Sequence, residues 1–233
     1  MIIEQEASLI LTATSVEVRW TTGALLRFER SRLPDSFLRW QSEARLRLLR
    51  LMSEQGAEAV RVNPAHLPVV ATIGIGAFPA NLACRGIGVL PCRDRLEEFT
   101  QLLEQARLAG EGEPPPVTLA RRAEAAAKVY ADPGCFDQTV LGGLEIFEGQ
   151  TAANLLRNPL ASLLYVGEAP HFLSYQLNCV VQTVGDQDPS YRFLRAAREL
   201  FARDHFHVTQ KRYPGGYLFH VVEVRDKTPY PRP

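Results

Sequence analysis

A short polar segment follows a predicted strand in the second half of the chain. Residues Thr139 to Phe147 are predicted to form the strand, and residues Glu148 to Arg157 a short helix that Asn158-Pro159 terminates. A helix that begins directly after a strand presents unpaired N–H groups and the positive end of its dipole, which favours binding of a phosphate. The side chains that could serve such a site are Gln150, Thr151, Asn154 and Arg157.

The roles expected in this helix follow from residue type. Thr151 would add a hydroxyl donor and Arg157 a positive charge to a bound anion. A purely structural explanation stays open for the same residues. Asn154 and Asn158 can cap or end the helix, and Thr151 can be an N-terminal helix hydroxyl that binds no ligand.

Three histidines near the C-terminus form a second candidate site. His205 and His207 fall on one face of a predicted strand, because side chains alternate along a strand. His220 lies on the next predicted strand, and a hairpin through Gly215-Gly216 can bring it across. Three histidines on adjacent strands suit zinc, iron or haem. Strand histidines that are simply exposed are the commoner case.

Motifs for other kinds of chemistry are missing from the sequence. It contains neither a G-x-S-x-G nucleophile motif nor a glycine-rich phosphate loop. The four cysteines are sparse and have no C-x-x-C spacing, which argues against a disulfide framework. Cys135 follows the turn Pro133-Gly134, and a lone cysteine beside a turn is usually inert.

Length and composition restrict the class of protein. The 233 residues can bury one large core or two small ones, and 46% hydrophobic with 22% charged residues is typical of a folded chain. Lys plus Arg equals Asp plus Glu, at 26 each, so no basic face for nucleic acid is expected. No signal peptide and no apolar run long enough to span a bilayer is visible, so a cytoplasmic protein without a membrane partner is expected.

The pattern of elements predicts an α+β fold in two parts. The best linker is Gly110 to Pro116 (GEGEPPP), which separates an N-terminal α/β region, residues 1–115, from a second domain, residues 116–233. Predicted elements of the first part are strands at 8–13, 16–20, 24–28, 60–62 and 69–75 and helices at 35–55 and 94–106. Those of the second part are helices at 119–130, 148–157 and from 188, and strands at 139–147, 160–166, 172–184, 205–211 and 217–224.

The second part resembles a known family. The stretch GLEIFEGQTAANLLRNPLASLLYVG, Gly143 to Gly167, followed by the long strand of Ser174 to Val184, is similar to the middle of the FMN-binding split-barrel superfamily, which includes pyridoxamine-phosphate oxidase-like and flavin reductase-like proteins. In that family a strand leads into a short helix of the form N-L-x-x-N-P, here Asn154 to Pro159, and an apolar strand follows. The oxidase-like members often carry Lys or Arg where this chain has Thr151.

The resemblance implies a split β-barrel in the second part of the chain. The barrel strands that precede the matched segment would come from Val69 to Leu90, with Arg93 to Asp132 as an insertion. It also implies a bound FMN, anchored by Gln150, Thr151, Asn154 and Arg157, and a homodimer with the flavin at its interface. Some relatives bind haem, which keeps the histidine site open.

Three hypotheses about function follow. The first is an FMN-dependent oxidoreductase that acts on a small organic substrate, in which the flavin performs the hydride chemistry. The second is a cofactor-free accessory or dimerisation module that binds a partner protein. The third is a haem- or metal-binding protein that uses His205, His207 and His220.

Overall fold

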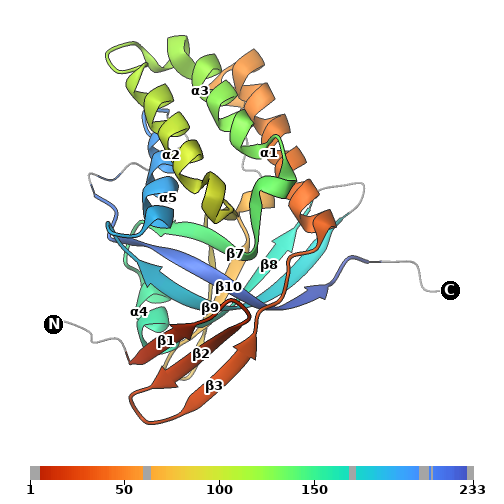
Figure 1. Ribbon diagram of the computed structural model, residues 1–233, viewed down its shortest axis with the longest axis vertical. Helices are drawn as coiled ribbons and strands as arrows, with labels where there is room; N and C mark the ends of the chain where they lie inside the picture. The colour runs from red at the N-terminus through yellow and green to blue at the C-terminus, as the bar shows by residue number, and fades with distance from the viewer. Residues whose placement is uncertain (1–5, 60–63, 168–171, 205–209, 211, 230–233) are drawn as a thin grey trace.

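The longest strand, β10 (Gly215–Asp226), lies inside a seven-stranded antiparallel sheet. The computed structural model describes residues 6–59, 64–167, 172–204, 210 and 212–229. The strands follow the order β5-β4-β8-β9-β10-β7-β6, and Figure 1 shows them crossing the middle of the molecule. The other six strands are β4 (Val69–Ile73), β5 (Ala80–Cys84), β6 (Ile87–Pro91), β7 (Phe136–Glu145), β8 (Leu160–Val166) and β9 (Ser174–Val184).

The two edge strands of this sheet are neighbours in the sequence. Only Arg85 and Gly86 separate the end of β5 from the start of β6, and three peptide units span at most about 11 Å. The two edges therefore lie close together, although no ladder joins them among the described strands. The sheet is curled and open, which is compatible with the predicted α+β, split-barrel-like class, and the described strands form no closed barrel.

The strands expected from Val69 to Leu90 are confirmed, because β4, β5 and β6 join the same sheet as the strands of the second part. Strands on both sides of residue 115 are thus hydrogen-bonded into one sheet. The division of the chain into an N-terminal region, 1–115, and a second domain, 116–233, stays a prediction. The expected insertion between β6 and β7 consists of two helices, α2 and α3.

The start of α1 (Asp35–Gln55) packs into the interior of the curled sheet. Phe37 is fully buried, and its ring contacts Tyr165 and Tyr175 edge to face, with centroids 5.1 and 5.4 Å away. The Tyr165 hydroxyl donates to the Ile87 carbonyl oxygen at 3.2 Å, which links β8 to the non-adjacent β6 across the interior. Gly56 is the C-cap residue of the helix and has a φ of 85°, which favours glycine.

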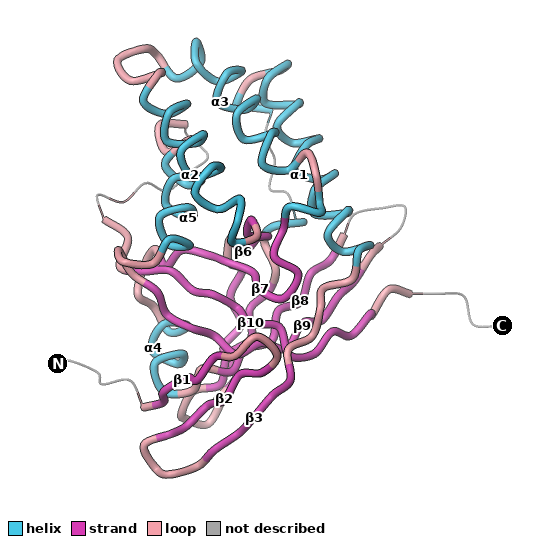
Figure 2. The backbone as a smooth tube through the Cα atoms, in the orientation of Figure 1, coloured by secondary structure: helices cyan, strands magenta, loops and turns pink. Residues whose placement is uncertain are grey.

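Three further helices form a layer with the rest of α1 on the outer face of the sheet. They are α2 (Arg93–Leu108), α3 (Pro115–Tyr130) and α5 (Pro189–Glu199), and Figure 2 shows them together above the strands. Their apolar side chains share a core with Leu90, Val140 and Leu218, which β6, β7 and β10 direct outward. Asp188 caps α5 by accepting from the Ser190 N–H at 2.7 Å, and Pro189 occupies the first turn as predicted.

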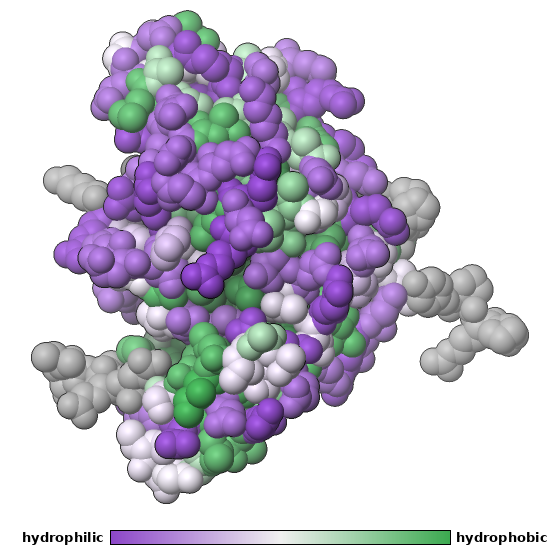
Figure 3. Space-filling model, viewed as in Figure 1, coloured by the Kyte–Doolittle hydropathy of each residue, from purple (hydrophilic) through white to green (hydrophobic). Residues whose placement is uncertain are grey.

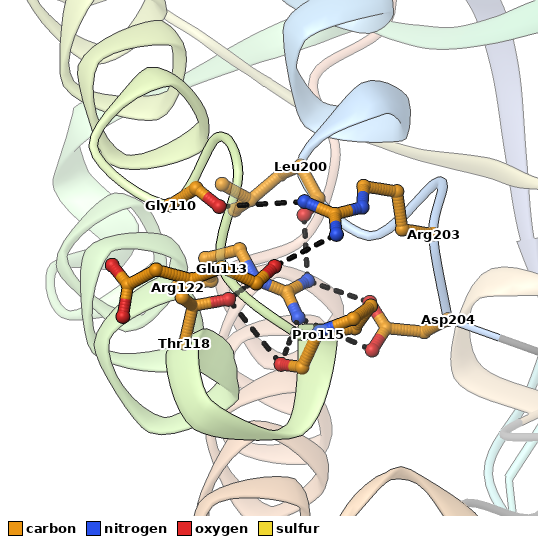
Figure 4. A network of polar contacts seen from close by, with 8 residues as sticks. All are labelled: Gly110, Glu113, Pro115, Thr118, Arg122, Leu200, Arg203 and Asp204. Atoms are coloured by element: carbon orange, nitrogen blue, oxygen red, sulfur yellow. Dashed lines mark hydrogen bonds and ion pairs between the residues drawn. The ribbon is translucent and has the colours of Figure 1, made fainter.

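A buried arginine holds this helical layer together (Figure 4). Arg122 of α3 donates to both carboxylate oxygens of Asp204, at 2.6 and 3.2 Å, and both side chains are almost fully buried. Its remaining N–H groups donate to Thr118 Oγ1 and to the carbonyl oxygens of Pro115 and Leu200. The start of α3 is therefore fixed to the chain that follows α5.

The three strands predicted at 8–13, 16–20 and 24–28 form a separate, smaller antiparallel sheet. Its strands are β1 (Ala7–Leu11), β2 (Ser15–Trp20) and β3 (Leu25–Glu29). Val16 and Val18 pack against Val180 of β9 and are fully buried. Figure 3 shows a largely hydrophilic surface over the helices and more hydrophobic surface toward the small sheet, where β1 and β3 leave several large apolar side chains exposed.

The short helix α4 (Gln150–Arg157) lies apart from the other helices, on the opposite side of the sheet from the helical layer (Figure 1). It starts two residues later than predicted because Glu148 has a φ of 47°, a left-handed conformation that a helix excludes.

Most of the predicted strand 205–211 and all of the predicted strand 60–62 lie outside the described residues. Among those that are described, no helix is both long and apolar enough to span a membrane. Short 3-10 turns occur at Ala57–Ala59, Pro64–His66 and Pro133–Cys135.

Candidate functional site

Helix α4 is tied to the β4–β5 hairpin by a buried polar network. Asn154 Nδ2 donates to Thr72 Oγ1 of β4 at 3.1 Å, and both residues are at most 2% exposed. Asn81 Nδ2 of β5 donates to Thr151 Oγ1 at 3.1 Å and to Thr72 Oγ1 at 3.3 Å. Gln150 Nε2 completes the network by donating to Asn154 Oδ1 at 2.7 Å. Three of the four predicted anchors, Gln150, Thr151 and Asn154, thus belong to this network.

Gly74 is needed where the hairpin approaches this network. A Cβ atom at this position would lie 2.4 Å from Asn154 Oδ1, closer than any side chain tolerates. The close approach places the end of β4 directly against α4. The sequence shows Gly74 only as a break in an apolar run, because the contact that requires a glycine is made with a residue far along the chain.

The N-terminal end of α4 is open. Gly149, the N-cap residue, has no side chain to cap the helix, and Glu148, Gly149 and Gln150 are exposed. The first intrahelical hydrogen bond runs from the Ala153 N–H to the Gly149 carbonyl oxygen. The N–H groups of Gln150, Thr151 and Ala152 precede this bond; Gln150 is exposed, whereas Thr151 and Ala152 are buried.

Arg157 lies away from this open end. It is the last residue of α4, about 10 Å along the helix axis from Gln150. Its Nε is 3.8 Å from Glu6 Oε1, in an ion pair between two half-exposed side chains. The positive charge expected beside the bound anion is therefore at the wrong end of the helix, because an eight-residue helix separates its two ends by more than the length of a contact.

The structure brings three of the four predicted residues together and leaves Arg157 apart from them. Thr151 and Asn154 are buried and hydrogen-bonded internally, Gln150 is engaged with Asn154, and Arg157 lies at the other end of the helix. The part of α4 that an anion can reach is the exposed backbone at Gly149 and Gln150, which no side chain caps. A cofactor-binding role for these side chains stays a prediction.

A buried carboxylate precedes α4, and no sequence motif marks it. Glu145 Oε1 accepts the N–H groups of Ile146, Phe147 and Glu148 at 2.8 to 3.0 Å, and Arg85 Nη1 donates to the same oxygen at 2.8 Å. Burial alone raises the pKa of this carboxyl, but Arg85 and the backbone N–H groups outweigh burial, and the pKa is lowered overall. The chain thus supplies its own anion to this cluster of backbone amides.

Tyr217 completes the surroundings of this carboxylate. Its hydroxyl donates to Glu145 Oε2 at 3.1 Å. Burial and the neighbouring Glu145 charge raise the pKa of Tyr217, so the phenol stays protonated and acts as a donor. Sequence analysis missed Glu145 because three of its partners are backbone groups, which no residue type reveals.

Of the three predicted metal ligands, His220 lies among the described residues. His205 and His207 lie outside the described residues, so their role as metal ligands stays a prediction. His220 is buried on β10, with Nε2 3.0 Å from Gln182 Oε1 of β9. Burial and the nearby Arg30 charge lower the pKa of His220 to about 4, so the imidazole is neutral near pH 7. Among the residues with described coordinates, no group of side chains could hold a metal ion.

A shallow cavity of about 580 Å³ lies between the small sheet and β9. Its lining is mixed in character, with apolar, aromatic, hydroxyl and cationic side chains, and includes none of the four predicted residues of α4. Gln182 contributes to the wall and is held from behind by His220. The residues that line the cavity are Ala7, Ser8, Leu9, Arg19, Trp20, Thr21, Gln182 and Thr183.

The outer face of β5, β4 and β8 carries apolar side chains that no described element covers. Val70 and Leu163 are paired and fully buried in the interior, so their neighbours along each strand point outward. We call this surface the apolar edge face. Its large side chains are Leu82 (67% exposed), Ile73 (51%), Val166 (46%) and Leu164 (40%), together with Ile75 (81%) and Phe78 (95%) in the hairpin loop.

Comparison with known proteins adds little. No protein-family model and no curated protein matches the sequence. Among solved structures, HupZ from Group A Streptococcus is 13% identical, with a TM-score of 0.39 over 70% of this chain and 86% of its own. A pyridoxamine 5'-phosphate oxidase, so described, from Listeria innocua is 11% identical, with a TM-score of 0.36 over 70% and 88%. An FMN-binding protein from Syntrophomonas wolfei is 10% identical, with a TM-score of 0.37 over 84% and 95%.

Likeness of this degree carries no argument about function. The similar structures include FMN-binding and pyridoxamine-phosphate oxidase-like proteins, in line with the resemblance of the sequence.

Proposed function

We propose that this chain is a cofactor-free split-barrel module that acts through self-association, with the apolar edge face as its homodimer interface. The observation that carries the proposal is the exposure of Ile73, Ile75, Phe78 and Leu82 on one continuous hairpin. Burying a side chain of this size contributes about 1.5–3 kcal/mol. Monomeric proteins seldom expose a contiguous apolar patch of this kind, and such patches commonly mark interaction sites.

The absence of charge on this surface favours a copy of the same chain as the partner. Residues 69–84, which make up β4, β5 and the loop between them, contain no Asp, Glu, Lys or Arg, and neither does β8. Exposed edge strands usually carry charges that prevent pairing with another chain. A neutral, apolar surface offers no charges that a different protein could complement. Two copies of it can pack against each other across a two-fold axis without electrostatic repulsion.

The edge position of β5 supports the same arrangement. β5 pairs only with β4 among the described strands, so one side of its backbone has free hydrogen-bonding groups. Two copies can therefore combine side-chain burial with strand pairing. Thr151, Asn154 and Glu145 are hydrogen-bonded to other groups of the protein. This agrees with a structural role for α4 in supporting the hairpin.

Flavin binding at the open end of α4 is the second candidate. It is favoured by the uncapped, exposed N-terminus at Gly149 and by its position next to the apolar edge face, to which Asn154 and Gly74 connect it. In that case a dimer interface would adjoin the anion site, and a bound flavin would supply redox chemistry toward a small organic substrate.

Light scattering on the full chain separates the interface from other apolar surfaces. Leu82→Asp places a charge on the apolar edge face and is expected to convert dimer to monomer. Val117→Asp, at an equally exposed apolar position (67%) on α3, is the matched control and is expected to leave the dimer intact. A wild type that is already monomeric, or a dimer that survives Leu82→Asp, contradicts the proposal.

A titration with FMN tests the second candidate on the same samples. The cofactor-free proposal predicts no quenching of flavin fluorescence by the wild type. Saturable quenching that Gly149→Pro or Gln150→Glu weakens would instead favour flavin binding at α4, whatever the oligomeric state.

A further inference from the structure

Two cysteines that are far apart in sequence meet at the base of the helical insertion. Cys92 is the N-cap residue of α2, and Cys135 ends the short turn before β7. The Cys92 N–H donates to the Cys135 carbonyl oxygen at 2.7 Å, directly beyond the paired residues Pro91 and Phe136. The chain between the two cysteines contains both α2 and α3.

The backbone contact limits how far apart the two residues can be. With standard bond lengths, this hydrogen bond keeps the two Cα atoms within roughly 6.5 Å of each other. Disulfide-linked residues usually have Cα atoms about 4.4–6.8 Å apart. A bridge can therefore form here without a large movement of the backbone.

The two thiols are near each other and accessible to a small reagent. Both residues are partly exposed, and both are free thiols. Burial, a hydrogen bond to Asp132 at 3.5 Å and the neighbouring Cys92 together raise the pKa of the Cys135 thiol. The two residues thus lie next to each other, whereas Cys84 is exposed on β5 and Cys179 is buried in the interior.

We propose that Cys92 and Cys135 form a reversible dithiol–disulfide site that reacts with small disulfide oxidants of the glutathione type. The bridge would close the loop that contains α2 and α3 and so fasten the helical layer to β6 and β7. This inference is independent of the proposed homodimer, because neither Cys92 nor Cys135 belongs to the apolar edge face.

The exchange takes place in two balanced steps. The Cys92 sulfur, as a thiolate, attacks one sulfur of oxidised glutathione and releases one glutathione thiolate, leaving a mixed disulfide. The Cys135 sulfur then attacks the Cys92 sulfur and releases the second glutathione. The two thiol protons pass to the two glutathione thiolates, and glutathione disulfide is the species reduced. Cys92 reacts first because Asp132 holds the Cys135 thiol protonated.

Peptide mapping of the full chain tests this proposal. Reduced protein is incubated with oxidised glutathione, digested without reductant and analysed by mass spectrometry. The expected product is a peptide pair joined through Cys92 and Cys135, at unchanged yield in a Cys84→Ser control. A Cys135→Ser variant should instead retain glutathione on Cys92, because the second step is blocked.

The thermal stability of the two redox forms provides a second readout. The oxidised wild type is expected to melt about 5–10 °C above the reduced form, because the bridge closes a long loop. Dithiothreitol should reverse the change. Glutathione that stays on Cys84 alone, or on Cys92 of the wild type without a bridge, would overturn the proposal, and so would recovery of both cysteines as free thiols.

Discussion

Asn154 of α4 donates to Thr72 Oγ1 of β4 at 3.1 Å, and this contact joins residues 82 positions apart in the sequence. It fixes the short helix beneath the hairpin that carries most of the apolar edge face. The side chain that the sequence marks as a cofactor anchor is thus part of the support for the proposed interface.

Replacing Asn154 should therefore cost stability. Asn154→Ala removes the hydrogen bonds to Thr72 and Gln150 and leaves buried polar groups without partners, for which we expect a loss of about 1–3 kcal/mol. Gln150→Ala removes only the exposed end of the network and should cost less than about 0.5 kcal/mol. Urea unfolding of the two variants measures the difference, and equal effects would argue against a supporting role for Asn154.

Glu145 should make stability depend on pH in the acid range. Its pKa is lowered in the folded state from the usual 4.5, so the carboxylate stabilises the fold above pH 4.5, and this contribution is lost as the pH falls below that value. Glu145→Gln should be less stable at pH 7 by about 1–3 kcal/mol and should lose less stability on acidification. Unfolding curves between pH 3 and 7 test this, and parallel pH profiles for the two proteins would contradict it.

His220 should contribute in a separate pH window. Its pKa is lowered from 6.5 to about 4, so the folded state resists protonation that the unfolded chain accepts. Stability is therefore highest above pH 6.5 and falls as the pH drops toward 4, by up to about 3 kcal/mol. His220→Gln should remove this slope between pH 6.5 and 4.5 and keep the Glu145 slope below it. An unchanged slope in this variant would show that His220 is not the group responsible.

Arg122 should be the most sensitive position of the helical layer. Arg122→Met leaves the buried Asp204 carboxylate without its partner, and a loss of about 3–5 kcal/mol is expected. Arg121→Met breaks an exposed ion pair with Glu113 and should cost at most about 1 kcal/mol. Adding Asp204→Leu to Arg122→Met should restore part of the stability. Denaturant unfolding decides, and similar losses for Arg121 and Arg122 would contradict this account.

Local patterns predicted most of the helices and strands. Helix α1 covers the predicted residues 35–55, α5 begins one residue after the predicted position 188, and β2 and β3 pair where strands at 16–20 and 24–28 were predicted. These features depend on neighbours within a few residues, so the sequence contains the information needed. The family resemblance led to the expectation that residues 69–90 supply further strands, and β4, β5 and β6 lie in the same sheet as β7 to β10.

The details of the site depend on contacts that sequence order does not reveal. Thr151 was expected to donate to a ligand, which stays a prediction, and the sequence did not reveal that its oxygen accepts from Asn81 of β5. Glu145 escaped notice because its partners are mainly backbone N–H groups, and Cys92 and Cys135 become neighbours only when the insertion folds back on itself. Each of these depends on tertiary approach of segments far apart along the chain.

The mass of the wild-type chain in solution tests the central claim most directly. Sedimentation equilibrium over a range of micromolar concentrations should give twice the chain mass of 26.0 kDa, with dissociation only on strong dilution. A single species of 26.0 kDa at every concentration would mean that the apolar edge face does not join two copies of this chain.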